Sequence, residues 1–216
     1  MMQIRTKKSE VTRERILSVA AEHFAAHGYH QARVADICRK AEANQAAVSY
    51  HFGGKYELYE ESLRYALELA NAKYPLPVDQ SIQAEERLKL FLTAVCQRIF
   101  DESEGSLFPR MMVKEMADPT EALETILRDL VANERDTVIG IVREILGPKA
   151  TEEDIILSHL SIVALFQFFN FSRSIRQLLQ RKMRRLPPNV ENVIDHTIGF
   201  ALAGIHHKQA EIAARA

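Results

Sequence analysis

A segment near the amino end of the chain combines very small side chains with hydrogen-bond donors. Ala46 and Ala47 leave one face of a short helix almost without bulk, so this face can approach the floor of a DNA groove and contact a thymine methyl group. Side chains with donors stand on both sides of these alanines and can bind base edges or backbone phosphates. The segment therefore predicts contact with double-stranded DNA. The predicted contact residues in it are Asn44, Gln45, Ala46, Ala47, Ser49, Tyr50, His51 and Lys55.

Two short helices are expected to position these residues. Apolar side chains recur at helical spacing over residues 34–41. After a turn of two or three residues, Asn44 is the expected cap of the next helix, because its side chain can accept from an exposed backbone amide. Two helices joined by so tight a turn form a helix-turn-helix.

The faces of the second of these helices follow from its periodicity. Val48 and Phe52 lie one turn apart and are expected to anchor the helix to the core, so Ala46 and Tyr50 point outward. The competing interpretation is that Tyr50 and His51 form only an aromatic seam between packed helices.

A basic stretch lies at the amino terminus. Between residues 5 and 15 arginine and lysine outnumber glutamate, and such an arm can follow the DNA backbone or reach into the minor groove. We therefore add Arg5, Lys7 and Lys8 to the predicted DNA contacts. The formal net charge of the chain is only -1, so the DNA-binding surface has to be a local basic patch that is balanced by acid elsewhere.

The pattern of the whole chain indicates an all-α protein. Its 216 residues are 47% hydrophobic and 26% charged, which is typical of a globular protein. Prolines fall between stretches of helical periodicity, and no alternating strand pattern occurs. We predict a DNA-binding domain at residues 1–54 and a larger helical domain at residues 55–216, linked by a helix over 55–74. The other expected helices cover residues 11–27, 34–41, 84–102, 110–116 and 119–146, with one helix from residue 151 and a last one from about residue 189.

The sequence predicts no catalytic residue, no cofactor and no metal. Glycine motifs of nucleophile elbows and dinucleotide sites are missing, and Cys38 and Cys96 are interpreted as small core residues. His23 and His27 lie one helical turn apart and could share a metal, but no third ligand is evident nearby. The longest apolar run, residues 157–171, is too short for a membrane span, and we expect a cytoplasmic protein.

The segment from about Thr12 to Leu63 carries a family resemblance in Ile16, Ala20, Phe24, Gly28, Tyr29, Val34, Ile37, Ala41, Tyr50, His51, Phe52, Lys55 and Leu58. With these residues it resembles the amino-terminal domain of the TetR family of bacterial transcriptional regulators. The sequence of residues 44–55, with Lys-Glu-Met-Ala-Asp-Pro-Thr at 114–120, is similar to the CecR-like branch more narrowly.

Two positions depart from the family pattern. Many relatives carry a threonine that caps the second helix and touches phosphate, where this chain has Ala32 and Arg33, so Arg33 is predicted to make the phosphate contact. In the turn, Glu42 stands where glycine is usual, and it has to tolerate an awkward backbone angle.

The resemblance implies a ligand chamber and a dimer interface in the carboxy-terminal helices. For either set of residues the alternative is ordinary core packing within one chain, and Arg110 and Glu115 form either a structural ion pair or a ligand clamp. The predicted ligand-binding residues are Phe108, Met111, Met112, Met116, His159, Phe166, Gln167 and Asn170. The predicted dimer-interface residues are Ile194, Ile198, Ala201, Leu202 and Ile205, with Gly199, Ala203 and Gly204 beside them.

The functional expectation is a ligand-responsive repressor that binds a palindromic operator as a homodimer. The resemblance implies that an unknown small-molecule effector, apolar or amphipathic, moves the linking helix and lowers the affinity for DNA. The alternatives are a helical protein-protein adaptor without DNA binding and a small all-helical enzyme. The basic run between Arg173 and Arg185 is most simply a solvated helical face. For this run the alternatives are the entrance for an anionic ligand and an additional contact with nucleic acid.

Overall fold

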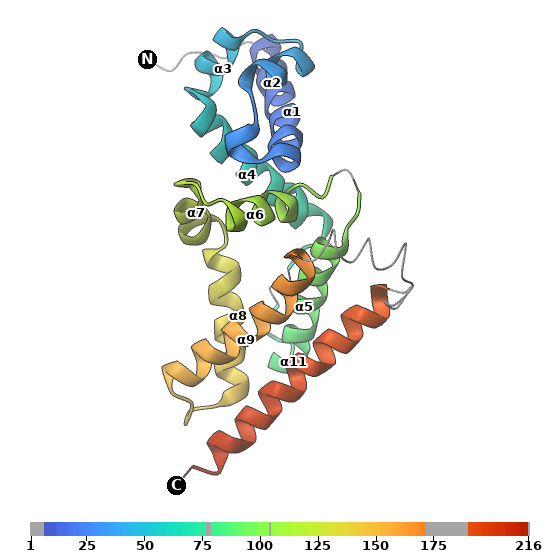
Figure 1. Cartoon of the computed structure of the whole chain (residues 1–216). Coiled ribbons are helices and arrows are strands. Elements are labelled where there is room, and N and C mark those ends of the chain that lie inside the picture. Colours follow the sequence, from blue (N-terminus) through green and yellow to red (C-terminus); the bar gives the residue numbers. More distant parts are fainter. Residues whose placement is uncertain (1–6, 77–78, 104, 172–189, 216) are drawn as a thin grey trace. The chain divides into compact units, whose positions relative to one another are not determined.

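The computed structural model describes residues 7–76, 79–103, 105–171 and 190–215. The basic run between Arg173 and Arg185 lies outside these described residues. Over these residues the chain forms helices and no strand, which confirms the all-α prediction (Figure 1). The helices in chain order are α1 Lys7–Gln31, α2 Val34–Lys40, α3 Gln45–Phe52, α4 Lys55–Lys73, α5 Ala84–Phe100, α6 Phe108–Ala117, α7 Ala122–Thr125, the π-helix η1 Ile126–Leu130, α8 Ala132–Leu146, α9 Glu152–Phe171 and α11 Val190–Ala213.

The chain divides into two compact units that are interleaved in the sequence. Unit 1 comprises Met1–Lys73 and Ser103–Leu130, and unit 2 comprises Tyr74–Glu102 and Val131–Ala216. Unit 1 thus holds α1–α4 together with α6, α7 and η1, whereas unit 2 holds α5, α8, α9 and α11. The sequence analysis placed a domain boundary between residues 54 and 55 because DNA binding was expected of residues 1–54. This functional boundary stays a prediction.

In unit 1, α1 packs against α4 and α6. Its buried stripe includes Ile16, Ala20 and Phe24, each with no exposed surface, at the spacing of one helical face. The helix was expected to stop at Gly28, and it does break there, because this glycine has φ 74° and ψ 172°. Glycine carries no Cβ and adopts this conformation without strain, so one further turn of α1 starts in a new direction.

The helix-turn-helix forms as predicted. α2 ends at Lys40, and the Asn44 side chain accepts a hydrogen bond of 2.8 Å from the backbone N–H of Ala47, which confirms the predicted cap of α3. Glu42 has φ 49°, as its place in the turn led us to expect. Arg15 compensates for the unusual residue: it donates to the Glu42 carbonyl at 3.2 Å and lies 3.8 Å from the Glu42 carboxylate.

The prediction of one helix over residues 119–146 is wrong. Pro119 is not the first helical residue, because the next helix, α7, begins only at Ala122. The carboxylate of Glu115 accepts from the Thr120 backbone N–H at 3.1 Å, and the Thr120 hydroxyl accepts from the Ala122 N–H at 3.2 Å. These bonds delay the helix start. Farther on, η1 widens the helical turn, and Val131 at φ -104° and ψ 2° separates η1 from α8.

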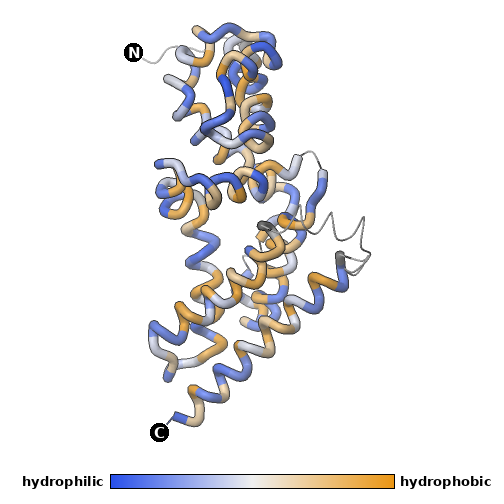
Figure 2. Tube along the Cα trace, viewed as in Figure 1, coloured by the Kyte–Doolittle hydropathy of each residue, from blue (hydrophilic) through white to orange (hydrophobic). Residues whose placement is uncertain are grey.

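Unit 2 is a bundle of α5, α8, α9 and α11 around one apolar core. Hydrophobic and hydrophilic positions alternate along these helices, as expected of amphipathic elements (Figure 2). Cys96 lies in this core and Cys38 in unit 1, both as buried free thiols. Burial raises the pKa of Cys96 to about 12, so it stays a protonated, unreactive core residue.

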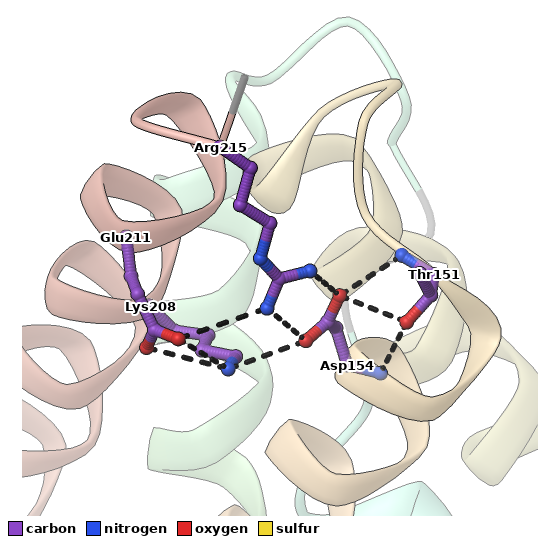
Figure 3. Close-up of polar contacts among 5 residues, drawn as sticks. All are labelled: Thr151, Asp154, Lys208, Glu211 and Arg215. Atoms are coloured by element: carbon purple, nitrogen blue, oxygen red, sulfur yellow. Dashed lines mark hydrogen bonds and ion pairs between the residues drawn. The ribbon is translucent and has the colours of Figure 1, made fainter.

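An ion cluster joins the start of α9 to the end of α11. Asp154 forms a capping box with Thr151, since it accepts from the Thr151 N–H at 3.0 Å and Thr151 Oγ1 accepts from the Asp154 N–H at 3.2 Å. The same carboxylate binds Arg215 through two bonds of 2.6 and 2.9 Å, and Lys208 lies 3.2 Å away (Figure 3). The cluster fixes the carboxy-terminal end of α11 on the bundle.

Candidate nucleic-acid interface

The outward face of α3 has the slim shape that its sequence predicts. Val48 and Phe52 are buried in unit 1, with 2% and 7% of their surface exposed. On the opposite side Ala46 is exposed, and Tyr50 has 66% of its surface in solvent. The competing interpretation of an aromatic seam therefore fails for Tyr50. His51 lies between the two faces: it is half-buried, with ring centroids 4.9 Å from Tyr50 and 6.2 Å from Phe52.

Several of the remaining predicted contacts are exposed. Gln45 and Ser49 are exposed, Ala47 is half-buried, and Arg33 is exposed at the residue before α2, where it makes no capping hydrogen bond. Asn44 is exposed as well, with its side-chain oxygen engaged in the α3 cap. Arg5 lies outside the described residues, and of Lys7 and Lys8 the structure describes only that they begin α1.

Arg13 of α1 contacts the buried side of α3, a role that the sequence analysis did not predict. Its guanidinium lies 5.0 Å from the centre of the Phe52 ring and pairs with the carboxylate of Glu61 on α4. A cation over an aromatic face is attracted by the negative potential of the ring. Because Phe52 is the buried anchor of α3, this contact fixes the helix against both α1 and α4. In the sequence Arg13 is only a basic residue one turn before an apolar stripe, and this pattern does not indicate a contact with Phe52.

Lys55 stands at the start of α4, where free backbone N–H groups favour an anion. The residue is half-buried, and its Nζ lies 4.5 Å from the centre of the Tyr29 ring. Burial lowers the pKa of Lys55 below its ordinary value. Tyr29 was noted in the sequence for its resemblance to the family pattern alone, and its contact with Lys55 was not predicted.

Metal chemistry finds no support in the described ranges. The rings of His23 and His27 lie 4.5 Å apart, but no group of three candidate ligands forms among the residues that the structure describes. Burial, and then the neighbouring His27, lower the pKa of His23. The buried His23 is therefore a neutral core histidine at neutral pH.

Two family models match this chain. The amino-terminal model of bacterial regulatory proteins of the tetR family matches residues 16–62, and the model of the carboxy-terminal domain of the HTH-type transcriptional dual regulator CecR matches residues 84–205. The second match alone covers more than half of the chain. The chain belongs to the TetR family, in its CecR-like branch. It is thus a member of a family of transcriptional regulators and not of enzymes, which also decides against the enzyme alternative.

Curated TetR relatives match over a limited segment. The chain is 38% identical over 72 residues to the HTH-type transcriptional regulator SrpR of Pseudomonas putida, which is 33% of this chain and 31% of SrpR. It is 36% identical over 72 residues to TtgW, an uncharacterized HTH-type transcriptional regulator of Pseudomonas putida, over 33% of this chain and 49% of TtgW. The matches thus span less than half of either relative.

Solved structures share the TetR fold over most of the chain. A putative TetR-family regulator from Rhodococcus sp. has a TM-score of 0.69 at 20% identity and covers 90% of this chain and 98% of its own. The putative regulator SCO4942 from Streptomyces coelicolor has a TM-score of 0.60 at 18% identity and covers 88% and 96%. In the described part of this TetR-family chain, no helix combines the length and apolar character needed to cross a membrane.

The predicted ligand residues of this TetR regulator fall into both units. On α6 of unit 1, Met111 and Met112 are buried, Phe108 is half-buried and Met116 is 42% exposed. On α9 of unit 2, His159 and Phe166 are buried and Gln167 is half-buried, whereas the Asn170 side chain lies outside the description. Glu115, the expected partner of Arg110, instead accepts from the hydroxyls of Tyr59 and Thr120 at 2.5 and 3.0 Å. A common ligand chamber stays a prediction.

The predicted dimer-interface residues need a correction. All five side chains belong to the buried core of unit 2, with at most 7% of their surface exposed, so one chain already covers them. They are Ile194, Ile198, Ala201, Leu202 and Ile205. The sequence analysis assigned the apolar stripe of α11 to a partner chain, but in the structure this stripe packs on the bundle of its own chain. Gly199, Ala203 and Gly204 beside it are exposed, as is Phe200 with 63% of its surface.

Proposed function

We propose that this TetR-family protein is a repressor that binds a palindromic operator as a homodimer and is released by a small-molecule effector. The observation that carries the proposal is the exposed, slim face of α3, where Ala46 and Tyr50 point away from a core that holds Val48 and Phe52. In a symmetric dimer two such helices enter successive major grooves about 34–36 Å apart. Binding to chromosomal DNA would place the protein in the cytoplasm.

Selection from a random DNA library tests this proposal. Duplexes retained by the purified protein should share two inverted half-sites whose centres lie about one helical turn apart. Footprinting on the selected duplex should protect both half-sites on the same side of the helix. Recovery of single half-sites would contradict the dimeric arrangement, and recovery of no common sequence would contradict sequence-specific repression.

An apolar surface on unit 2 supports the homodimer. Leu157, Leu160 and Phe168 recur along one face of α9, with 54%, 53% and 66% of their surfaces exposed. On α11, which packs beside α9, Phe200 is exposed together with the small residues Gly199, Ala203 and Gly204. A cluster of exposed large apolar residues marks an interaction surface, and small residues let two helices approach closely. This surface, the α9–α11 face, replaces the buried residues that the sequence suggested.

A polar atom inside unit 2 supports an effector site. His159 is 8% exposed, and its Nδ1 makes no hydrogen bond. Burial, followed by the charge of Arg135, lowers the pKa of His159, so the neutral ring can donate or accept. Phe166 lies two turns along the same helical face. An amphipathic molecule with one polar group fits such surroundings.

A thermal-shift screen of apolar and amphipathic molecules tests the effector site. A ligand that uses His159 should raise the melting temperature of the wild type and lose much of this effect in His159→Leu. The same ligand should release the protein from the selected duplex. Stabilisation without release would contradict the coupling between effector and DNA.

The adaptor alternative makes a different prediction. A helical protein-protein adaptor would retain no duplex from the library, and substitution of Tyr50 and Lys55 by alanine would leave its activity intact. Loss of function in both variants would favour the DNA-binding regulator.

A further inference from the structure

We infer that Tyr29 is a positioning residue for DNA binding, which holds the ammonium group of Lys55 at the place where it meets a backbone phosphate. This inference rests on the proposed function, because it names how one of the proposed phosphate contacts is prepared. Tyr29 lies on the last turn of α1, and Lys55 is the first residue of α4, so the contact joins two elements of unit 1.

The geometry of the pair leaves Lys55 able to bind. Its Nζ lies 4.5 Å from the centre of the Tyr29 ring, within the range at which an ammonium ion is attracted by an aromatic face. A lysine ammonium has three N–H donors, and a ring face occupies one side of it. Donors on the other side remain for phosphate oxygens. The flexible side chain thus has fewer conformations to lose when DNA arrives.

The ring of Tyr29 is itself fixed by its neighbours. Its centroid lies 5.1 Å from that of Tyr59 and 6.3 Å from that of Tyr56, and the second pair meets edge to face. Tyr59 has no exposed surface, and its hydroxyl donates to the buried Glu115 carboxylate at 2.5 Å. The core of unit 1 therefore fixes the position of the Tyr29 ring. Through its contact with this ring, the Lys55 side chain is held more firmly than a lysine that is surrounded by solvent alone.

The break in α1 explains how Tyr29 reaches this place. Gly28 adopts φ 74°, so Tyr29 leaves the helical path of the residues before it. A Cβ atom at residue 28, which glycine lacks, would lie 3.6 Å from the Lys114 side chain. The last turn of α1 thus has its own direction, which carries the Tyr29 ring to the start of α4.

A double-mutant cycle on DNA binding tests the inference. The proteins are the wild type, Tyr29→Leu, Lys55→Ala and the double variant, each titrated with a mixed-sequence duplex at several salt concentrations. Tyr29→Leu should weaken binding about twofold to fivefold in the wild-type background, the range of an exposed cation–π contact. In the Lys55→Ala background it should have no further effect. Tyr29→Phe keeps the aromatic face and should bind like the wild type.

The contact is also measurable without DNA. Nζ of Lys55 lies over the ring. The NMR signals of the protons on the adjoining Cε should therefore be shifted upfield in the wild type and in Tyr29→Phe, and should return to ordinary positions in Tyr29→Leu. Equal weakening of DNA binding by Tyr29→Leu with and without Lys55 would overturn the inference, since the tyrosine would then act only through the fold. An unshifted signal in the wild type would overturn it as well. If the wild type binds no duplex while the shifted signal is present, the proposed function fails and the contact between the two residues stands as a structural one.

Discussion

Lys55 lies both at the start of a helix and against the face of an aromatic ring. Because it is expected to neutralise one phosphate, Lys55→Ala should weaken binding to every duplex and reduce the salt dependence of log K by about one unit. Titrations with fluorescent DNA over a range of salt measure this slope. The matched control is Lys89→Ala, which removes a lysine from α5 of unit 2 that pairs with Glu85 and Glu86. A slope that is the same in Lys55→Ala and wild type would contradict the phosphate contact.

The buried carboxylate of Glu115 gives a second prediction at this scale. Burial, and then the hydrogen bond to Glu115, raise the pKa of Tyr59 far above its ordinary value, so its hydroxyl remains a donor. Tyr59→Phe leaves the carboxylate without this bond. The free energy of unfolding should fall by about 1.5–3 kcal/mol, the range for hydrogen bonds to charged groups. Denaturant titration measures it. Tyr65→Phe on the same helix should cost less, and equal losses in the two variants would argue against a special role for Tyr59.

Among the elements, α3 depends on its cap. Asn44→Ala removes the acceptor for the Ala47 N–H and should lower the free energy of unfolding by about 1 kcal/mol, whereas Asn44→Ser should keep most of the stability. The unfolding transition followed by circular dichroism measures both. If serine destabilises as much as alanine, Asn44 contributes through something other than the cap.

The ion cluster between α9 and α11 predicts a pH dependence. The hydrogen bond from Arg215, followed by that from the Thr151 backbone, holds the pKa of Asp154 far below its ordinary value. The stabilisation is therefore complete above the unfolded pKa of about 3.9 and is lost as the pH falls below it. Melting temperatures of wild type and Asp154→Asn should differ most at neutral pH and converge in acid. A difference that does not depend on pH would contradict the charge of Asp154 as the cause.

Periodicity predicted which elements form but not always what their faces meet. The inward face of α3 and the cap at Asn44 followed from side-chain type and spacing, because both depend on neighbours within one turn. The break before Ala122 depends on Glu115, whose hydrogen bonds to Thr120 reach across the end of α6. The buried stripe of α11 looks the same in sequence whether it packs on its own bundle or on a partner. Contacts such as that between Tyr29 and Lys55 join segments that are distant in the sequence, so no local sequence pattern predicts them.

At the scale of the whole molecule, the account requires that unit 2 brings two chains together. Phe200→Glu on the α9–α11 face replaces a largely exposed aromatic side chain by a charge and should produce monomers, since burying an unpaired charge is strongly unfavourable. Sedimentation equilibrium measures the mass. Leu90→Glu, on a residue of α5 that is 41% exposed, is the matched control and should leave the dimer intact. A wild type that sediments as a monomer at all concentrations would contradict the proposed assembly.

The monomeric variant also separates assembly from DNA recognition. If two half-sites must be bound together, Phe200→Glu should lose affinity for the selected duplex while it keeps weak binding to mixed-sequence DNA. Undiminished affinity for the selected duplex would show that one chain suffices.

Bulk added to the slim face of α3 tests the central claim most directly. Ala46→Leu should abolish binding to the selected duplex with an unchanged melting temperature, because the side chain is exposed and its larger replacement would hold the helix away from the bases. Ala26→Leu, at another exposed alanine of unit 1, should bind that duplex as the wild type does. If Ala46→Leu retains full sequence-specific affinity in a mobility-shift titration, α3 does not read DNA through this face, and the proposed function falls.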